Sequence, residues 1–222
     1  MNIPLKLLSV MVTVFFSLTA CNDNNMKTAK TEIVTDNMKP DSKPGNMDEM
    51  KGDNGMMASM NTMMQKMSGM EMSGDFDMDF ANMMIEHHQG AIDMSEEELK
   101  SGLDAKMKSM AQNIITAQKK EQGKLRDIIK NAKPMTMDMG KHEELNEETK
   151  AMAADMKNMQ MTKNTDQDFA RMMIFHHESA VEMSKAELSH GMNAELKTRA
   201  KMMIADQTKE ITEFKTWLSE NK

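Results

Sequence analysis

Two pairs of adjacent histidines each follow a pair of adjacent methionines by one helical turn. Each histidine has a methionine four positions earlier, in the order Met83, Met84, His87, His88 and again Met172, Met173, His176, His177. Residues at i and i+4 are surface neighbours on a helix, so each such pair could hold a common ion. At about 100° per residue, Met94 and Met183 lie on the same helical face as the first histidine of each pair.

Thioether and imidazole ligands together favour copper over the other common biological metals. A thioether is a soft, neutral ligand that suits Cu(I), and imidazole binds both Cu(I) and Cu(II). Zinc prefers thiolates, imidazoles and carboxylates, whereas calcium and magnesium prefer oxygen clusters. The ten residues just named therefore predict copper sites, with Cu(I) favoured and Cu(II) possible.

These residues belong to a gapless internal repeat with an offset of 89 residues. Residues 79–95 read DFANMMIEHHQGAIDMS, and residues 168–184 read DFARMMIFHHESAVEMS. The register continues downstream, where Glu121 recurs as Glu210, and upstream, where Met70 and Met72 recur as Met159 and Met161. The sequence therefore predicts one duplicated unit.

Each copy is expected to contribute two long helices. The predicted ranges are 75–100 and 104–130 in the first copy, and 166–189 and 193–219 in the second, with a further short helix at 143–159. Gly102 and Gly191 stand where a helix end and tight turn would need glycine, and Asp75 and Thr165 or Asp166 are candidate N-caps. Two duplicated hairpins predict an all-α, ferritin-like four-helix bundle with additional short Met-rich helical segments.

The amino terminus reads as a bacterial export signal. Lys6 precedes an apolar run from Leu7 to Leu18, which is shorter than the ~20 residues that a membrane-spanning helix needs. Leu18-Thr19-Ala20-Cys21 matches a lipobox, which predicts lipidation at Cys21. Residues 1–21 are therefore expected to be a signal, and the mature protein to be anchored in the cell envelope, at the outer membrane facing the periplasm.

Residues 22–57 are predicted to be a flexible tether, because they contain almost no Ile, Leu, Val or Phe. The duplicated domain is placed at 58–222, with repeat 1 at about 58–130, a connector at 131–146 and repeat 2 at about 147–219. Several of the 33 methionines lie in the tether and connector. We do not expect these methionines, which include Met56 and Met60, to be present in order to fill a hydrophobic core. The predicted accessory metal ligands are Met70, Met72, Met159, Met161, Met135, Met137, Met139 and His142.

Composition and motifs restrict the function. A net charge of −7 with interspersed signs argues against a nucleic-acid partner. A dinuclear carboxylate oxidase would need a Glu-x-x-His on each of two helices. Glu187 and His190 have that spacing, but the first copy has Glu98 and Ser101. A structural lipoprotein whose Met-rich surface binds partner proteins is the other alternative.

The duplicated D-F-x-x-M-M-I-x-H-H-x-x-A-x-x-M-S pattern resembles a family of secreted bacterial proteins of formally unknown function. The resemblance covers about residues 60–218, and it implies a ferritin-like bundle that handles copper through Met and His. Some members are similar to periplasmic copper-binding proteins. The expectation is therefore a non-enzymatic copper buffer or chaperone, with copper ions, the membrane and a copper donor or acceptor protein as partners.

Overall fold

The structure is a computed structural model, and it describes residues 55–132, 142–156 and 158–222. All the helices of this part belong to one compact unit that begins at Met50. They are α1 (Gly55–Ser68), α2 (Phe76–Ser101), α3 (Ala105–Asn131), α4 (His142–Met156), α5 (Thr165–His190) and α6 (Ala194–Glu220). The signal, its lipobox and most of the predicted tether lie outside the described residues.

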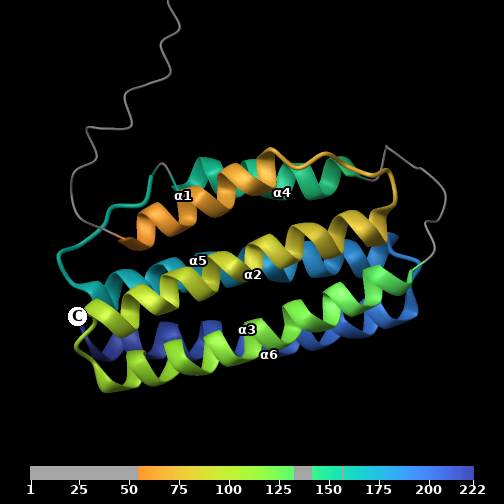
Figure 1. Ribbon diagram of the computed structural model, residues 1–222. Coiled ribbons are helices and arrows are strands. Elements are labelled where there is room, and N and C mark those ends of the chain that lie inside the picture. Colours follow the sequence, from red (N-terminus) through yellow and green to blue (C-terminus); the bar gives the residue numbers. More distant parts are fainter. Residues whose placement is uncertain (1–54, 133–141, 157) are drawn as a thin grey trace, which may run out of the picture. The chain divides into compact units, whose positions relative to one another are not determined.

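The helices form three layers of two (Figure 1). The pair α2 and α5 lies in the middle, α3 and α6 cover one side, and α1 and α4 cover the other. The helices α2, α3, α5 and α6 are the predicted four-helix bundle, so the all-α fold class is confirmed. Because α2 and α5 are covered on both sides, their histidines and methionines are positioned inside the protein.

Short polar side chains begin the four long helices. Asp75 accepts a hydrogen bond from the backbone N–H of Met78, and Asp104, Asn164 and Asn193 cap α3, α5 and α6 in the same way. Asp75 was predicted correctly. The prediction of Thr165 or Asp166 as the cap of α5 is wrong, because Asn164 takes that position and leaves Asp166 free to reach the other copy.

Asp77 and Asp166 join the two copies at their helix ends. Asp166 Oδ1 accepts from the backbone N–H groups of Leu103 and Asp104, at 3.0 and 2.8 Å. Asp77, its counterpart in the first copy, accepts from Met192 and Asn193, with both Oδ1 distances between 2.9 and 3.0 Å. Each carboxylate thus satisfies the exposed N–H groups that precede a helix of the opposite copy.

A fully buried glutamate contacts each of these aspartates. Burial raises the Glu98 pKa to about 8, and the nearby Asp166 carboxylate raises it as well. Burial likewise raises the Glu187 pKa to about 9, with a further contribution from the Asp77 carboxylate. Each glutamate is therefore a neutral acid near pH 7, with a proton to donate to its aspartate. We call these two pairs, Glu98–Asp166 and Glu187–Asp77, the carboxyl clasps.

The carboxyl clasps explain the two glycines at the ends of α2 and α5. Gly102 and Gly191 have φ values of −67° and −61°, which any residue can adopt. The predicted conformational reason for glycine is therefore wrong at these positions. A Cβ atom at Gly102 would overlap the Glu98 carboxyl group, and one at Gly191 would overlap that of Glu187. Glycine is needed because it leaves space for a buried acid.

The shorter helices α1 and α4 are also copies of one another. Met63 and Met67 of α1 correspond to Met152 and Met156 of α4, and all four side chains are buried. Met56 and Met60 are buried as well, at 1% and 0% exposure. The prediction that core packing does not account for Met56 and Met60 is therefore wrong, because α1 begins at Gly55 and buries this face. No helix of the described chain is both long and apolar enough to span a membrane.

Candidate metal centre

Four histidines meet where α2 lies against α5. The side chains of His87, His88, His176 and His177 are 0–1% exposed. The rings of His87 and His176 lie 3.8 Å apart between centroids, with 42° between their planes. His176 and His177 are 5.7 Å apart. The two copies therefore bring together residues that are 89 positions apart in the sequence. We call this set the histidine tetrad.

Both neighbouring layers approach the tetrad. His177 contacts α6, with its ring 6.2 Å from that of Phe214 and its Nε2 atom 2.8 Å from Glu210 Oε2. That last approach is within ion-pair distance but outside hydrogen-bond geometry. Gly90 lies on the same side of α2 as His87. A Cβ atom at Gly90 would lie only 2.5 Å from Met63 Sδ, so α1 packs closely against α2 there. The tetrad thus lies between both neighbouring layers.

The ring nitrogens of the tetrad are mostly without hydrogen-bond partners. His176 Nε2 lies 2.8 Å from the His87 carbonyl oxygen, so this nitrogen carries the proton and donates it. Among the described residues, neither ring nitrogen of His87 has a partner, nor do the Nδ1 atoms of His88, His176 and His177. A buried polar group without a partner costs roughly 1–3 kcal/mol. Such groups in a core are candidates for ligand binding.

Burial also keeps His87, His88 and His176 neutral. Desolvation lowers the pKa of His87 and of His176 well below 6.5, and it lowers the pKa of His88 to about 3. Neighbouring imidazoles lower the pKa values further, because a second positive charge would be repelled. The neutral imidazole is the form that binds metal ions. These three imidazoles are therefore ready to accept a cation at neutral pH without first losing a proton.

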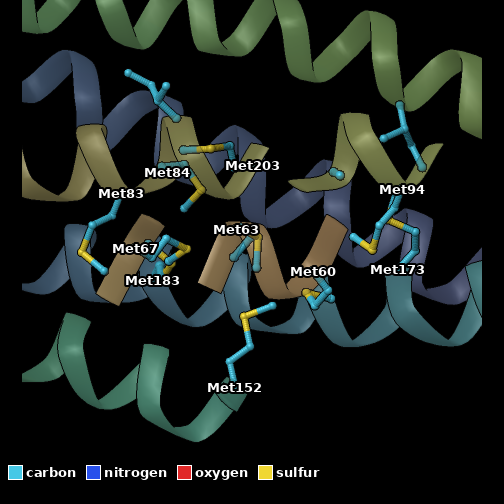
Figure 2. Close-up of a cluster of buried hydrophobic side chains, with 14 of the residues drawn as sticks. Met60, Met63, Met67, Met83, Met84, Met94, Met152, Met173, Met183 and Met203 are labelled. Atoms are coloured by element: carbon cyan, nitrogen blue, oxygen red, sulfur yellow. The ribbon is translucent and has the colours of Figure 1, made fainter. Parts of the chain in front are cut away.

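The predicted methionine ligands are buried in the same core as the tetrad. The predicted ligands Met83, Met84, Met94, Met172, Met173 and Met183 are all 0% exposed. Figure 2 shows Met83, Met84, Met94, Met173 and Met183 in one cluster with Met60, Met63 and Met67 of α1 and Met152 of α4. The third layer, which was not predicted as part of the specific site, thus adds thioethers next to the predicted ones. The signal for it was present, because Met63 and Met67 recur as Met152 and Met156.

The predicted accessory ligands fall into two groups. Met70, Met72, Met159 and Met161 are partly buried and pack against the core. Met135, Met137 and Met139 lie outside the described residues, as does Cys21. His142 begins α4, but its side chain is outside the described part of the chain. The structure therefore brings the ten principal ligands into the core and leaves the accessory ones at its edge or untested.

Within the described ranges, no group of three or more His, Cys, Asp or Glu side chains is arranged to hold a metal ion. The four imidazoles do not by themselves form a complete set of metal ligands. An ion bound here would therefore also need thioether ligands. The Glu-x-x-His spacing of Glu187 and His190 does not form a metal cluster either, because Glu187 contacts Asp77 and His190 packs against Phe76 at 5.4 Å.

Two charged contacts beside the tetrad were not predicted. Glu210 lies against His177, whereas its counterpart Glu121 forms an ion pair with Arg199 instead. The repeat of Glu121 as Glu210 was visible in the sequence. Their different partners were not predicted, although the sequence has Arg199 where the first copy has Met110.

Comparison with known proteins identifies relatives of this arrangement. No curated protein sequence matches the chain. Two crystal structures of CopM, in Cu(I)-bound and Cu(II)-bound forms, are similar at 29% and 30% identity. Both alignments cover 65% of this chain, and they cover 96% of the Cu(I)-bound and 97% of the Cu(II)-bound CopM chain, with TM-scores of 0.49 and 0.48. A fragment from Deinococcus radiodurans shares the fold at 19% identity and a TM-score of 0.50, covering 65% of this chain and 96% of its own.

The sequence pattern of one family matches the chain twice in succession, over residues 22–129 and 129–218. These two matches correspond to the two copies of the repeat, and together they span most of the chain. The predicted family resemblance is confirmed. The chain belongs to the family described as the domain of unknown function DUF305.

Proposed function

We propose that this protein binds copper ions as its cargo, Cu(I) in preference, and buffers them or passes them to a partner. The observation that carries the proposal is the histidine tetrad. It combines four buried imidazoles, most of whose nitrogens have no hydrogen-bond partner among the described residues, with buried methionines one helical turn away on the same helices. A buried ring nitrogen with no partner is unfavourable unless something binds it.

The available ligands favour copper over zinc or iron. The described core offers imidazole and thioether groups but no thiolate, and it offers no cluster of three His, Cys, Asp or Glu side chains. Thioethers bind Cu(I) well and bind hard cations poorly. CopM, with which this chain shares 29–30% identity, has been crystallised with Cu(I) and with Cu(II), which agrees with a copper ligand here.

Burial sets the rate at which the ion could exchange. Since the tetrad histidines and the six principal methionines are all at most 1% exposed, an ion must displace core side chains to enter or leave. The layer of α1 and α4 is the part best suited to move, because its helices are about half the length of the others. Methionine side chains are flexible, which helps such repacking.

The proposal includes a place and a class of protein. The lipobox at Cys21 and the export signal support a lipid-anchored protein of the cell envelope, at the outer membrane facing the periplasm. The absence of a recognisable catalytic motif supports a binding protein and not an enzyme. A copper donor or acceptor protein would then exchange the ion with the tetrad through ligand exchange.

The test is anaerobic Cu(I) titration of the chain lacking residues 1–21 against a competing chromophoric chelator. We expect copper to be retained, and we expect a variant with His87, His88, His176 and His177 replaced by glutamine to lose it. His190→Gln is the matched control, because His190 packs against Phe76 outside the tetrad and its loss should leave binding unchanged. Far-UV circular dichroism of each variant checks that the helices form.

A second set of variants tests the sulfur ligands. Met83→Leu with Met172→Leu removes sulfur and conserves volume, so copper affinity should fall while folding changes little. Met56→Leu is the control, since Leu145 occupies the equivalent position of the second copy and is fully buried there. Unchanged copper binding in the four-histidine variant would refute the proposal. Preference for iron or manganese with turnover of oxygen would instead support the oxidase alternative.

A further inference from the structure

We propose that the two copies hold unequal copper sites: Glu210 orients His177 in the second copy, and Arg199 withdraws the equivalent carboxylate, Glu121, from the first. This inference rests on the proposed copper function and adds which site binds more tightly and why. Glu210 is a positioning residue in this scheme, because it acts on the metal through His177.

Glu210 lies close enough to His177 to act on it through its charge. Its Oε2 atom lies 2.8 Å from His177 Nε2, within ion-pair distance but outside hydrogen-bond geometry, while the His177 side chain is 0% exposed and that of Glu210 is 25% exposed. A carboxylate at this place favours the tautomer with a proton on Nε2. The lone pair is then on Nδ1, which has no partner among the described residues. Metal-binding histidines commonly direct their second nitrogen at such a carboxylate, which orients the ring and strengthens the ligand.

The other histidine of the second copy is fixed in the same sense. His176 Nε2 donates to the His87 carbonyl oxygen at 2.8 Å, so the lone pair of His176 also lies on Nδ1. Both imidazoles of the second copy therefore offer the same free atom before any ion arrives. A site whose ligands are already oriented binds more tightly, because less ordering is needed on binding.

The first copy lacks both restraints. His87 has no hydrogen-bond partner on either ring nitrogen among the described residues, so nothing selects its tautomer. Glu121, which would be the counterpart of Glu210, instead accepts from Arg199 Nε at 2.7 Å and also pairs with Arg199 Nη2. A two-point arginine–carboxylate pair is among the strongest charged contacts and holds its carboxylate in one orientation.

The arginine is a feature of one copy only. The residue of the first copy equivalent to Arg199 is Met110, which is buried. The equivalent position of the first copy is thus occupied by methionine. We therefore expect the fold to tolerate Arg199→Met. It should release Glu121 toward His88 in the way that Glu210 already approaches His177.

The experiment measures the two Cu(I) affinities of the chain lacking residues 1–21 by chelator competition. Glu210→Gln should weaken the tighter site by about 10- to 100-fold and leave the weaker one unchanged. Arg199→Met should strengthen the weaker site by a similar factor, and adding Glu121→Gln to it should abolish that gain. Glu213→Gln, also on α6 but paired with Lys209, is the control and should change neither affinity.

A second readout needs no copper. Nitrogen-15 NMR of the imidazoles should show the Nε2–H tautomer for His177 in the unsubstituted protein, and a mixture of tautomers in Glu210→Gln. If that variant does not fold, the Arg199→Met and Glu121→Gln pair still tests the inference from the other copy. Measurable copper binding with affinities unmoved by Glu210→Gln and Arg199→Met would overturn this inference alone. Failure of the unsubstituted protein to bind copper would overturn the proposed function itself.

Discussion

Replacing Glu98 and Glu187 by glutamine should remove most of the pH dependence of folding stability between pH 7.5 and 8.5. Glutamine has the shape of a neutral glutamic acid, and its amide N–H can donate to Asp166 or Asp77 as the acid does. It cannot ionise. The substitution therefore keeps the carboxyl clasps and removes only their protons.

The sign follows from the direction of the pKa shifts. The Glu98 pKa rises from 4.5 to about 8 in the folded protein, and the Glu187 pKa rises from 4.5 to about 9. Between pH 4.5 and 8 the folded state thus holds one more proton per clasp than the unfolded state. The stability that each clasp contributes is full below pH 4.5 and is lost as the pH rises through the folded pKa.

The slope depends on the number of protons and not on the exact size of the shift. One proton changes the free energy of unfolding by about 1.4 kcal/mol per pH unit, so two clasps give a fall of roughly 2.7 kcal/mol per unit near pH 7. The slope becomes smaller as the pH approaches 8, where Glu98 begins to ionise in the folded state. Such a fall is a large fraction of a typical stability of about 5–15 kcal/mol.

The buried histidines act on the acid side only. The pKa values of His87, His88 and His176 are lowered in the folded protein, so these groups destabilise it below pH 6.5, where the unfolded chain takes up protons. At pH 6.5 half of these histidines are still protonated in the unfolded chain, and the protonated fraction falls to about one in ten by pH 7.5. The range from 7.5 to 8.5 therefore isolates the glutamates.

The assay is urea unfolding of the copper-free protein, followed by far-UV circular dichroism at several pH values across this range. The double glutamine variant should show a nearly flat profile and exceed the original protein in stability at pH 8. Glu182→Gln, an exposed residue paired with Lys185, is the control and should keep the original slope. Equal slopes for the original protein and the double variant would refute the reasoning.

Three further predictions concern folding stability and can be checked in the same urea assay. Gly123→Ala should stabilise the protein by about 0.5–1 kcal/mol, because a Cβ there meets nothing within 4 Å and alanine favours a helix interior; a loss of stability would contradict this. Gly102→Ala should destabilise it by about 1–3 kcal/mol, because its Cβ would overlap the Glu98 carboxyl and lie 2.7 Å from the Glu98 carbonyl oxygen. Asp104→Ala should cost about 1 kcal/mol through loss of the α3 cap, and no change would show that the cap is replaceable.

Much of the fold could be predicted because helical periodicity and the internal repeat are local signals. The four long helices begin and end within about two residues of their expected positions, and Asp75 caps α2 as predicted. The extent of α1 was harder to predict. Its buried residues are nearly all methionine, and a stretch of Met, Gly and Asn looks the same in sequence whether it lies in a tether or packs against α2.

The candidate site was predicted in part for a similar reason. The repeat identified His87, His88, His176 and His177 as a set, and the structure brings them together. The sequence did not show how their nitrogens are used. Contacts between the copies, such as the ion pair of Arg199 with Glu121, determine which carboxylate approaches an imidazole. The offset of a repeat contains no information about such contacts.

The contacts between the two copies are reciprocal. Asp77 of the first copy binds the chain before α6, and Asp166 of the second binds the chain before α3. An interface of this form is isologous, as in a symmetric homodimer, so a chain with only one copy would present a surface complementary to itself. Joining the copies in one chain makes their association independent of protein concentration. It also allows one half to carry Arg199 where the other carries Met110, an asymmetry that no symmetric homodimer can encode.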